Sequence, residues 1–300
     1  MGSPRLALVT WDAASRPHGV WNALASAEDG LIAGAVRARG VEVDRVAWSA
    51  PDADWSAYAS ILIRTTWDYF DRLPEFRAWL ERVDAVAPVW NPPRVVSWNA
   101  DKRYLFDLEE RGVRLPPTLH VRAGASIDLG AALAERGWEE VVIKRVVSAG
   151  AQGQERFPAG AAAPAQAHLD ALLATGDALV QPYLRSIAAR GETSLVAVNG
   201  VVVHGVRKVP RAGEYRSQPN FGSRVLLHDP TAEERELAER ALAAVGAATL
   251  HARIDMVALD DGRPALMELE LIEPYLFLDA DPGAVERLAD GILARLGERG

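Results

Sequence analysis

Three glutamates lie within six residues of the C-terminal segment LMELELIEPYLF: Glu268, Glu270 and Glu273. If this apolar segment forms a strand, Glu268 and Glu270 share one face, because side chains alternate along a strand. Charged side chains are seldom buried without partners, so two carboxylates on one strand face need a cation or water beside them. Glu273 falls on the other face just before a proline, and we leave it out of the expected site.

A hairpin count brings more charged groups to that strand face. The pair Asp261–Gly262 is typical of a two-residue type I′ turn and joins the preceding β-prone segment to this one. With this pair as the loop, Asp255 lies opposite Glu268, and Arg253 lies opposite Glu270. A bulge would shift the register by one residue, and the proline soon after the turn makes a bulge a specific risk.

Asp255, Glu268 and Glu270 form a candidate metal site. The Asp255–Glu268 pair sets two like charges side by side, which destabilises a sheet by up to about 1 kcal/mol, and by more when the pair is buried. A divalent cation removes this conflict, because Mg²⁺ binds carboxylate oxygens and completes its octahedron with waters and substrate phosphates. The alternative is a solvated edge hairpin whose acids serve solubility.

Two lysines and a small-residue loop are candidates for phosphate contacts. Lys144 ends the β-prone stretch EVVIK in a chain whose basic residues are mostly arginine. Gly150 and Gly153 follow it and would let backbone N–H groups approach phosphate oxygens. Lys102 falls in the first turn of an expected helix, where a cation opposes the macrodipole. The loop is not a Walker motif, no GxGxxG follows a strand, and a surface position is the alternative for each lysine.

Basic residues also surround the polar segment RAGEYRSQPNFGSR: Arg207, Lys208, Arg211 and Arg216. Long irregular loops of this kind are often functional. Clustered cations suit an acidic substrate or the negative charge of a transition state. A solvated basic loop is the alternative.

The elements expected before these residues indicate an α/β beginning. Residues 5–11 and 60–67 have the pattern of strands, with a helical segment between them. The first hundred residues therefore predict a small unit with a parallel sheet. Pro92 and Pro93 then break the periodicity, and we expect Asn99 to cap the following helix.

Composition limits the classes of function. The 300 residues suffice for two or three packed units, and the absence of cysteine excludes disulfides, cysteine-based zinc sites and thiol nucleophiles. A net charge of −8 gives no reason to expect nucleic-acid binding. No apolar stretch is long enough to span a membrane, and the N-terminus lacks the layout of a signal peptide. We expect a soluble cytoplasmic protein.

The order of these features resembles the ATP-grasp superfamily of ATP-dependent carboxylate–amine ligases. Over roughly residues 100–275 the chain has a helix lysine, a strand lysine with its small-residue loop, QPYL, GE, RKVPRAGEYRSQPNFG, RIDM and MELEL. It is most similar to the branch that contains bacterial glutathione synthetase and the cyclo-ligase of cycloserine biosynthesis. The resemblance implies an α/β fold, with a small N-terminal parallel-sheet domain and two α+β subdomains that grip ATP between them. The implied ranges are 1–98, 99–184 and 185–300.

Carried over to this sequence, the resemblance implies a role for each matching residue. Contacts to ATP would come from Lys102, Lys144, Ser148, Gly150 and Gly153 at the phosphates, from Gln181, Tyr183 and Leu184 at adenine, and from Glu192 at the ribose. Two Mg²⁺, with Mn²⁺ as an acceptable substitute, would be bound by Asp255, Glu268 and Glu270. Developing negative charge would be covered by Arg207, Arg216 and Arg253.

Two positions depart from the family's pattern. Glu270 stands where the glutathione synthetase pattern E-x-N has Asn, which keeps an oxygen ligand and adds charge. Lys208 is an extra residue in the R-x-P part of the loop. For the substrate itself, we expect contacts at a strand end of the first domain and on the polar loop, from Arg64, Trp67, Asp68 and Asn220.

The resemblance implies a two-step reaction. A substrate carboxylate attacks the γ-phosphate of ATP to give an acyl phosphate, and an amine then attacks that carbonyl while the protein positions the reactants and neutralises charge. We expect a ligase for small amino-acid-like substrates. The alternatives are an intramolecular cyclo-ligase and a non-catalytic nucleotide-binding protein with the same fold. The sequence leaves open a homo-oligomer.

Overall fold

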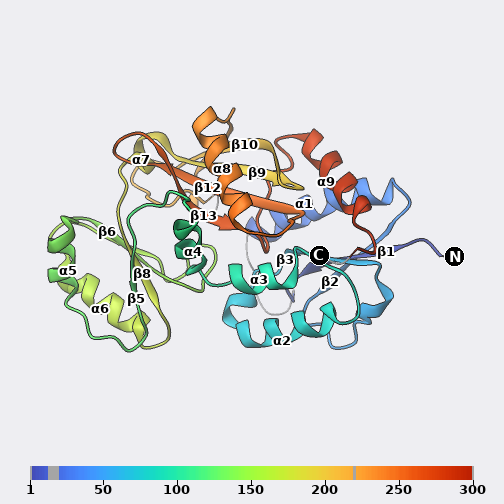
Figure 1. Cartoon of the computed structure of the whole chain (residues 1–300), viewed down its shortest axis with the longest axis horizontal. Helices are drawn as coiled ribbons and strands as arrows, with labels where there is room; N and C mark the ends of the chain where they lie inside the picture. The colour runs from blue at the N-terminus through green and yellow to red at the C-terminus, as the bar shows by residue number, and fades with distance from the viewer. Residues whose placement is uncertain (1, 13–19, 219–220, 299–300) are drawn as a thin grey trace.

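A computed structural model describes residues 2–12, 20–218 and 221–298 (Figure 1). These residues form three sheets, and each sheet lies within one of the three expected ranges, although the domain boundaries themselves stay a prediction. Figure 1 shows the N-terminal sheet at the lower right, the central sheet at the left and the C-terminal sheet above them. The expected α/β class is confirmed. Among the described residues, no helix combines the length and apolar character that crossing a bilayer requires.

The N-terminal sheet is parallel and buried on both faces. Its strands are β1 (Arg5–Thr10), β2 (Glu42–Ala47), β3 (Ser60–Thr65) and β4 (Val89–Trp90), in the order β2-β1-β3-β4. One face packs against α1 (Val20–Arg37) and α9 (Pro282–Ala294), and the other against α2 (Leu73–Asp84) and α3 (Pro93–Asn99). Short 3₁₀ turns, η1 (Trp55–Ala57) and η2 (Tyr69–Asp71), flank β3. Coverage on both faces accounts for the continuous apolar runs of β1 and β3.

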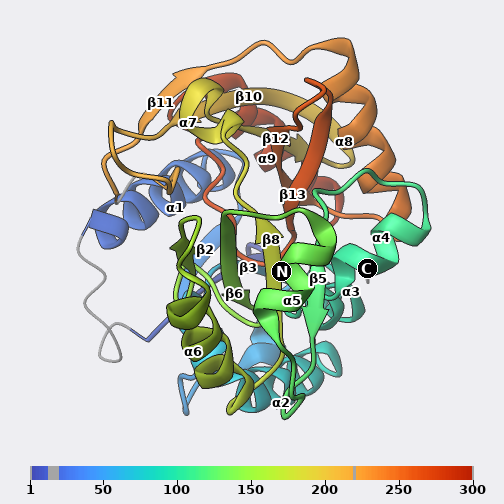
Figure 2. The same cartoon turned by 90° about the vertical axis from the view of Figure 1, so that its left-hand side faces the viewer.

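The central sheet is antiparallel. Its strands are β5 (Leu119–Val121), β6 (Val141–Arg145), β7 (Glu155–Phe157) and β8 (Ala178–Pro182), in the order β5-β8-β6-β7. The helices α5 (Leu129–Arg136) and α6 (Ala162–Leu173) share its core and lie toward the viewer in Figure 2. This small unit carries Lys144 on β6 and the loop that follows it.

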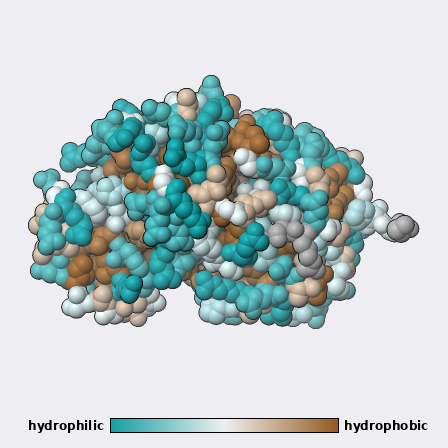
Figure 3. All heavy atoms as spheres, viewed as in Figure 1, coloured by the Kyte–Doolittle hydropathy of each residue, from teal (hydrophilic) through white to brown (hydrophobic). Residues whose placement is uncertain are grey.

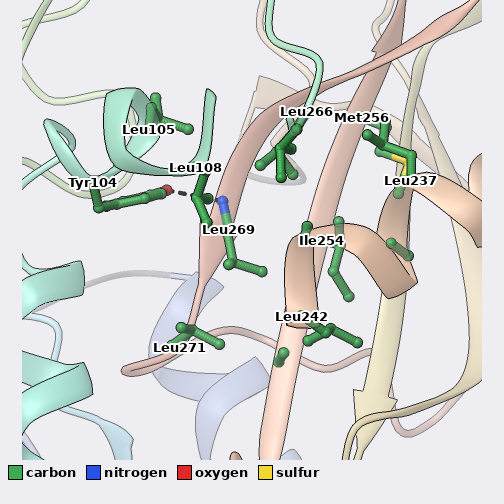
Figure 4. Close-up of a cluster of buried hydrophobic side chains, with 14 of the residues drawn as sticks. Tyr104, Leu105, Leu108, Leu237, Leu242, Ile254, Met256, Leu266, Leu269 and Leu271 are labelled. Atoms are coloured by element: carbon green, nitrogen blue, oxygen red, sulfur yellow. Dashed lines mark hydrogen bonds between the residues drawn. The ribbon is translucent and has the colours of Figure 1, made fainter. Parts of the chain in front are cut away.

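The C-terminal sheet holds the carboxylate hairpin. Its strands are β9 (Glu192–Val198), β10 (Val201–Val209), β11 (Arg224–Leu227), β12 (His251–Ala258) and β13 (Pro264–Glu270), in the antiparallel order β11-β10-β9-β12-β13. The helices α4 (Tyr104–Glu110) and α8 (Ala232–Ala244) cover one face, and the short α7 (Ser186–Arg190) precedes β9. Figure 4 shows Ile254, Leu269 and Leu271 in the core beneath them. Since side chains alternate, the charged residues of both strands face the other way.

The register of the hairpin differs from the expected one at two places that cancel. The turn closes with Leu259 opposite Arg263, so its loop has three residues and not two. A bulge at Met267 then adds one residue on β13, so Asp255 still pairs with Glu268. The expected pairing at the site is therefore correct, although the expected two-residue turn is wrong.

Side chains from residues 91–104 cap the free edge of β13. The Asn99 amide donates to the carbonyl of Leu269 at 2.8 Å and accepts from the N–H of Leu271 at 2.9 Å. The Tyr104 hydroxyl accepts from the N–H of Leu269 at 2.8 Å (Figure 4). Asn99 is thus the last residue of α3 and forms hydrogen bonds with the edge of β13, which corrects its expected role as the cap of the following helix. An edge strand with satisfied backbone groups is held in one position.

A buried ion pair joins α1, β3 and the segment after β13. Arg64 is 0% exposed, and its Nη2 lies 2.7 Å from Glu28 and 3.0 Å from the carbonyl of Pro274. The Glu28 carboxylate also accepts from the N–H groups of Leu276 and Leu278. Arg64 thus has a structural role in a buried ion pair, which corrects its expected role as a substrate contact.

We expect Glu28→Ala to lower the free energy of unfolding by about 3–5 kcal/mol, because it leaves a buried arginine without its counter-charge. Glu75→Ala is the matched control, since the Arg72–Glu75 pair lies at the surface, and it should leave the free energy of unfolding nearly unchanged. Urea unfolding of both variants measures the difference. Equal losses of unfolding free energy in both variants would show that the Glu28–Arg64 pair does not hold the N-terminal sheet to the segment after β13.

Candidate active site

A cavity of about 330 Å³ lies where the three sheets meet. It is lined by residues from the hairpin, from β6 and its loop, from β9 and β10, and from the turn after β3. The sequence has three lysines among 33 basic residues, and all three line this cavity: Lys102, Lys144 and Lys208. In the space-filling view, hydrophilic residues cover most of the outer face, and its lower edge is indented between the central and N-terminal units (Figure 3).

Three carboxylates on the cavity face of the hairpin are close enough to share a cation. One oxygen each from Asp255, Glu268 and Glu270 lies within 4.8 Å of the others. Asp255 is buried, and its carboxylate accepts a hydrogen bond from the Ser194 hydroxyl of β9. An all-oxygen set of this kind fits Mg²⁺, which prefers carboxylate ligands.

Arg253 and Lys208 offset the charge of Asp255. The Arg253 guanidinium donates to both carboxylate oxygens, from Nε at 3.0 Å and from Nη2 at 2.9 Å. The Lys208 ammonium lies 3.5 Å from Oδ2 and also pairs with Glu192. Burial would raise the pKa of Asp255, but Arg253 and Lys208 outweigh burial and hold that pKa below its ordinary value. Asp255 is therefore ionised.

The two glutamates differ in their surroundings. Lys102 Nζ lies 2.9 Å from Glu268 Oε1, and Lys102 and Lys144 hold the pKa of Glu268 below its ordinary value against the effect of burial. Burial raises the pKa of Glu270 to about 7, and the neighbouring carboxylates add to this, although Arg253 pairs with it. A cation at this position would favour the ionised form of Glu270.

Lys144 is placed to bind an anion. Its side chain is buried, and burial lowers its pKa. Among the described residues it has no carboxylate within ion-pair distance, and its nearest polar contact is the sulfur of Met267 at 4.0 Å. Lys102, in contrast, is held by Glu268 and by the carbonyl of Ser148 at 2.6 Å. The charge of Glu268 acts on Lys144 from a distance, but a buried ammonium with no carboxylate in direct contact is suited to bind a negatively charged ligand.

The loop after β6 contributes backbone to the cavity wall. Ser148 and Gly150 line the cavity, and Gly150 has a φ of 59°. Gly153 does not line it. A Cβ at Gly153 would lie 3.2 Å from the Arg145 side chain, so glycine permits this close approach, and the expected contact with phosphate stays a prediction.

The residues expected at the nucleoside lie in different places. Glu192 lines the cavity. Gln181 and Tyr183 do not: the Gln181 amide donates to Thr118, and the Tyr183 ring lies under Arg156 at 3.7 Å. Leu184 is buried beside them and also lies outside the lining. Their assignment to adenine and ribose stays a prediction.

Two expected catalytic arginines point away from the cavity. Arg207 lies on the opposite face of β10, where its Nη2 contacts His228 at 3.1 Å and Glu234 at 3.6 Å. Arg216 pairs with Glu214 at 2.9 Å, outside the cavity lining. The position of Arg207 corrects the expectation that it covers charge at the reaction centre, whereas the role expected for Arg216 stays a prediction. Lys208, the neighbour of Arg207 on the strand, faces the cavity instead. Lysine is rare in this chain, and this rarity could have identified Lys208 as a site residue from the sequence.

The residues that were expected to contact the substrate lie in different places. Trp67 lines the cavity, whereas Asp68 is buried and accepts from the Trp48 indole at 2.7 Å, which corrects its expected role. Asn220 lies outside the described residues. Glu273, which the strand pattern excluded, lines the cavity. Strand β13 ends at Glu270, so alternation no longer fixes the direction of Glu273.

Comparisons with known proteins agree with this geometry. Residues 6–91 match the family described as "D-cycloserine synthetase DcsG, N-terminal domain", and residues 135–271 match the "RimK-like ATP-grasp domain". The "Cycloserine biosynthesis protein DcsG" of Streptomyces lavendulae is 32% identical over 278 residues, which cover 87% of this chain and 91% of that protein.

Solved structures extend the comparison. The crystal structure of D-cycloserine synthetase DcsG has 31% identity and a TM-score of 0.86, with 97% of this chain and 99% of that chain covered. D-alanine–D-alanine ligase from Bacillus anthracis, in complex with ATP, shares the fold at 14% identity and a TM-score of 0.67, with 97% of each chain covered. The expected family and enzyme class are confirmed. The chain belongs to the ATP-grasp family of ATP-dependent ligases, in the group that contains D-cycloserine synthetase.

Proposed function

We propose that this ligase closes a ring within one small amino-acid-like molecule that carries both the carboxylate and the nitrogen nucleophile. The observation that carries the proposal is the match to D-cycloserine synthetase over nearly the whole chain, at a TM-score of 0.86. That similarity includes the N-terminal residues 6–91, from which Trp67, Tyr69 and Phe70 reach the cavity. Such an enzyme would work in the cytoplasm, where ATP and Mg²⁺ are available.

In the first step, an oxygen of the substrate carboxylate attacks the γ-phosphorus of ATP. The bond from that phosphorus to the β–γ bridging oxygen breaks, and ADP leaves. The unpaired ammonium of Lys144 binds a phosphate oxygen, and the N–H groups of the loop around Gly150 approach the same phosphates. Two Mg²⁺ or Mn²⁺ ions, held by Asp255, Glu268 and Glu270, would supply charge neutralisation there.

In the second step, the nitrogen lone pair attacks the acyl carbon. The bond from that carbon to the phosphate oxygen breaks, inorganic phosphate leaves with the electron pair, and the nitrogen gives up a proton. Arg253 lines the cavity between Asp255 and Glu270, where it can stabilise the oxyanion. No protein nucleophile takes part, so the chain's role is to position the two groups and exclude water.

Glu268→Gln and Lys144→Ala should each lower the rate of ADP formation at least about 100-fold, because each removes a charge that faces the phosphates. ADP release is measured with Mg²⁺ and a screen of amino acids, dipeptides and serine derivatives that carry a nitrogen nucleophile. The exposed Glu110→Gln is the control and should keep the wild-type rate. If ADP release is unchanged in both site variants, the assignment of the site is wrong.

The mass of the product separates the two kinds of ligation. A cyclised product has the mass of the substrate less one water, whereas joining two molecules gives the mass of both less one water. We expect the cyclised mass. A product that contains both molecules would support intermolecular ligation, and ATP binding without any product would support the non-catalytic alternative.

Lys208→Gln should lower kcat by at least about 100-fold, while Arg207→Gln should stay within about threefold of the wild type. The reason is that Lys208 faces Asp255 and Glu192 in the cavity, whereas Arg207 lies on the other face of β10. Steady-state kinetics give the comparison, and thermal unfolding shows that each variant is folded. A larger loss for Arg207→Gln would contradict the orientation of β10.

A further inference from the structure

Glu273 is a buried carboxylate that the two reaction steps do not use. It is 9% exposed and lines the cavity. Among the described residues, its carboxylate has no ion pair and no hydrogen bond from another side chain. Lys102 is already held by Glu268 and Ser148, and Arg253 by Asp255 and Glu270. Within the described part of the chain, no cation therefore lies in direct contact with the Glu273 carboxylate, which a buried carboxylate needs.

The backbone around Glu273 is held by three separate donors. The Trp67 indole donates to the carbonyl of Glu273 at 2.9 Å, and Arg64 donates to the carbonyl of Pro274 at 3.0 Å. Arg253 donates to the carbonyl of Tyr275 at 3.1 Å. Three successive carbonyls are thus fixed by the N-terminal sheet and by β12, so the direction of the Glu273 side chain is set before any ligand binds.

Aromatic rings form the wall beside this carboxylate. Trp67, Tyr69 and Tyr275 line the same cavity. The Trp67 ring stacks on Trp11 with 5.3 Å between centroids and 7° between planes, which holds it in place. A carboxylate beside aromatic rings suits an organic ammonium, which gains from both, whereas Mg²⁺ requires several oxygens. Glu273 does not belong to the three-carboxylate cluster that fits the metal.

We propose that Glu273 binds an ammonium group of the substrate that takes no part in ring closure. A nitrogen that stays charged on a carboxylate has no lone pair to attack the acyl carbon, so the nucleophile must be a different nitrogen. This inference rests on the proposed function. Burial raises the pKa of Glu273 to about 8, and the charge of Glu270 adds to this, while Lys102 opposes it only in part.

The test compares two probes that differ only in an amino group: D-cycloserine, and isoxazolidin-3-one, which is the same ring without that group. Their dissociation constants are measured by calorimetry with ADP and Mg²⁺ present. Wild type should bind D-cycloserine about 10- to 100-fold more tightly, the range for a hydrogen bond to a charged group. Glu273→Gln should bind both alike, Glu273→Asp should fall between, and Glu110→Gln should match the wild type. The melting temperature of Glu273→Gln should not fall, since among the described residues the Glu273 carboxyl group has no side-chain partner to lose.

Two results would overturn the inference or redirect the test. An equal preference for D-cycloserine in wild type and Glu273→Gln overturns it. If wild type binds neither probe, the cycloserine-type function fails, and the same variants are titrated with n-propylammonium and n-propanol by saturation-transfer NMR. A preference for the ammonium that requires Glu273 then supports the ammonium site, and equal signals from both variants overturn it.

Discussion

Three carboxylates crowd one face of the β12–β13 hairpin, one of them buried and two half-buried, and the rest of the site depends on this constraint. Their oxygens lie within 4.8 Å of one another, so they repel unless cations surround them. The surrounding cations are Arg253, on the hairpin itself, and three lysines that lie before α4, on β6 and on β10. The arrangement of the three sheets brings these cations around the acids, and Lys144 is the one that has no carboxylate in direct contact among the described residues.

The hairpin is held in one position by contacts along its free edge and by contacts to the segment that follows it. Along its free edge, Asn99 and Tyr104 satisfy the backbone groups that an edge strand would otherwise leave open. Beyond its end, the Glu28–Arg64 pair anchors the following segment to the N-terminal sheet. Groups held in place before the substrate arrives need no reorganisation during the reaction, which is the main source of electrostatic catalysis. The carboxylate hairpin and the segment that follows it are therefore held together by the same set of contacts.

The family was predicted from a resemblance in the order of the motifs. The fold class and the pairing of Asp255 with Glu268 were predicted from residue types at regular spacing. The sequence did not predict that a three-residue turn and a bulge at Met267 would cancel. Arg207 and Lys208 show most clearly what the sequence could not predict. Neighbouring residues on a strand face opposite sides, and no local pattern indicates which of two adjacent cations faces the cavity. Glu273 was missed for the same reason: alternation is a rule for strands, and β13 has ended by that point.

Residue type was the better guide where spacing failed. Arginine forms the surface ion pairs of this chain, such as Arg39 with Glu286, where its planar group can bind a carboxylate through two donors. Lysine occurs only three times and each time lines the cavity. A compact ammonium on a flexible stem contacts a phosphate as a point charge and can be buried in less space than a guanidinium. In an arginine-rich chain, the retained lysines therefore mark positions where a small cation is required, and they indicate the active site without any assumption about register.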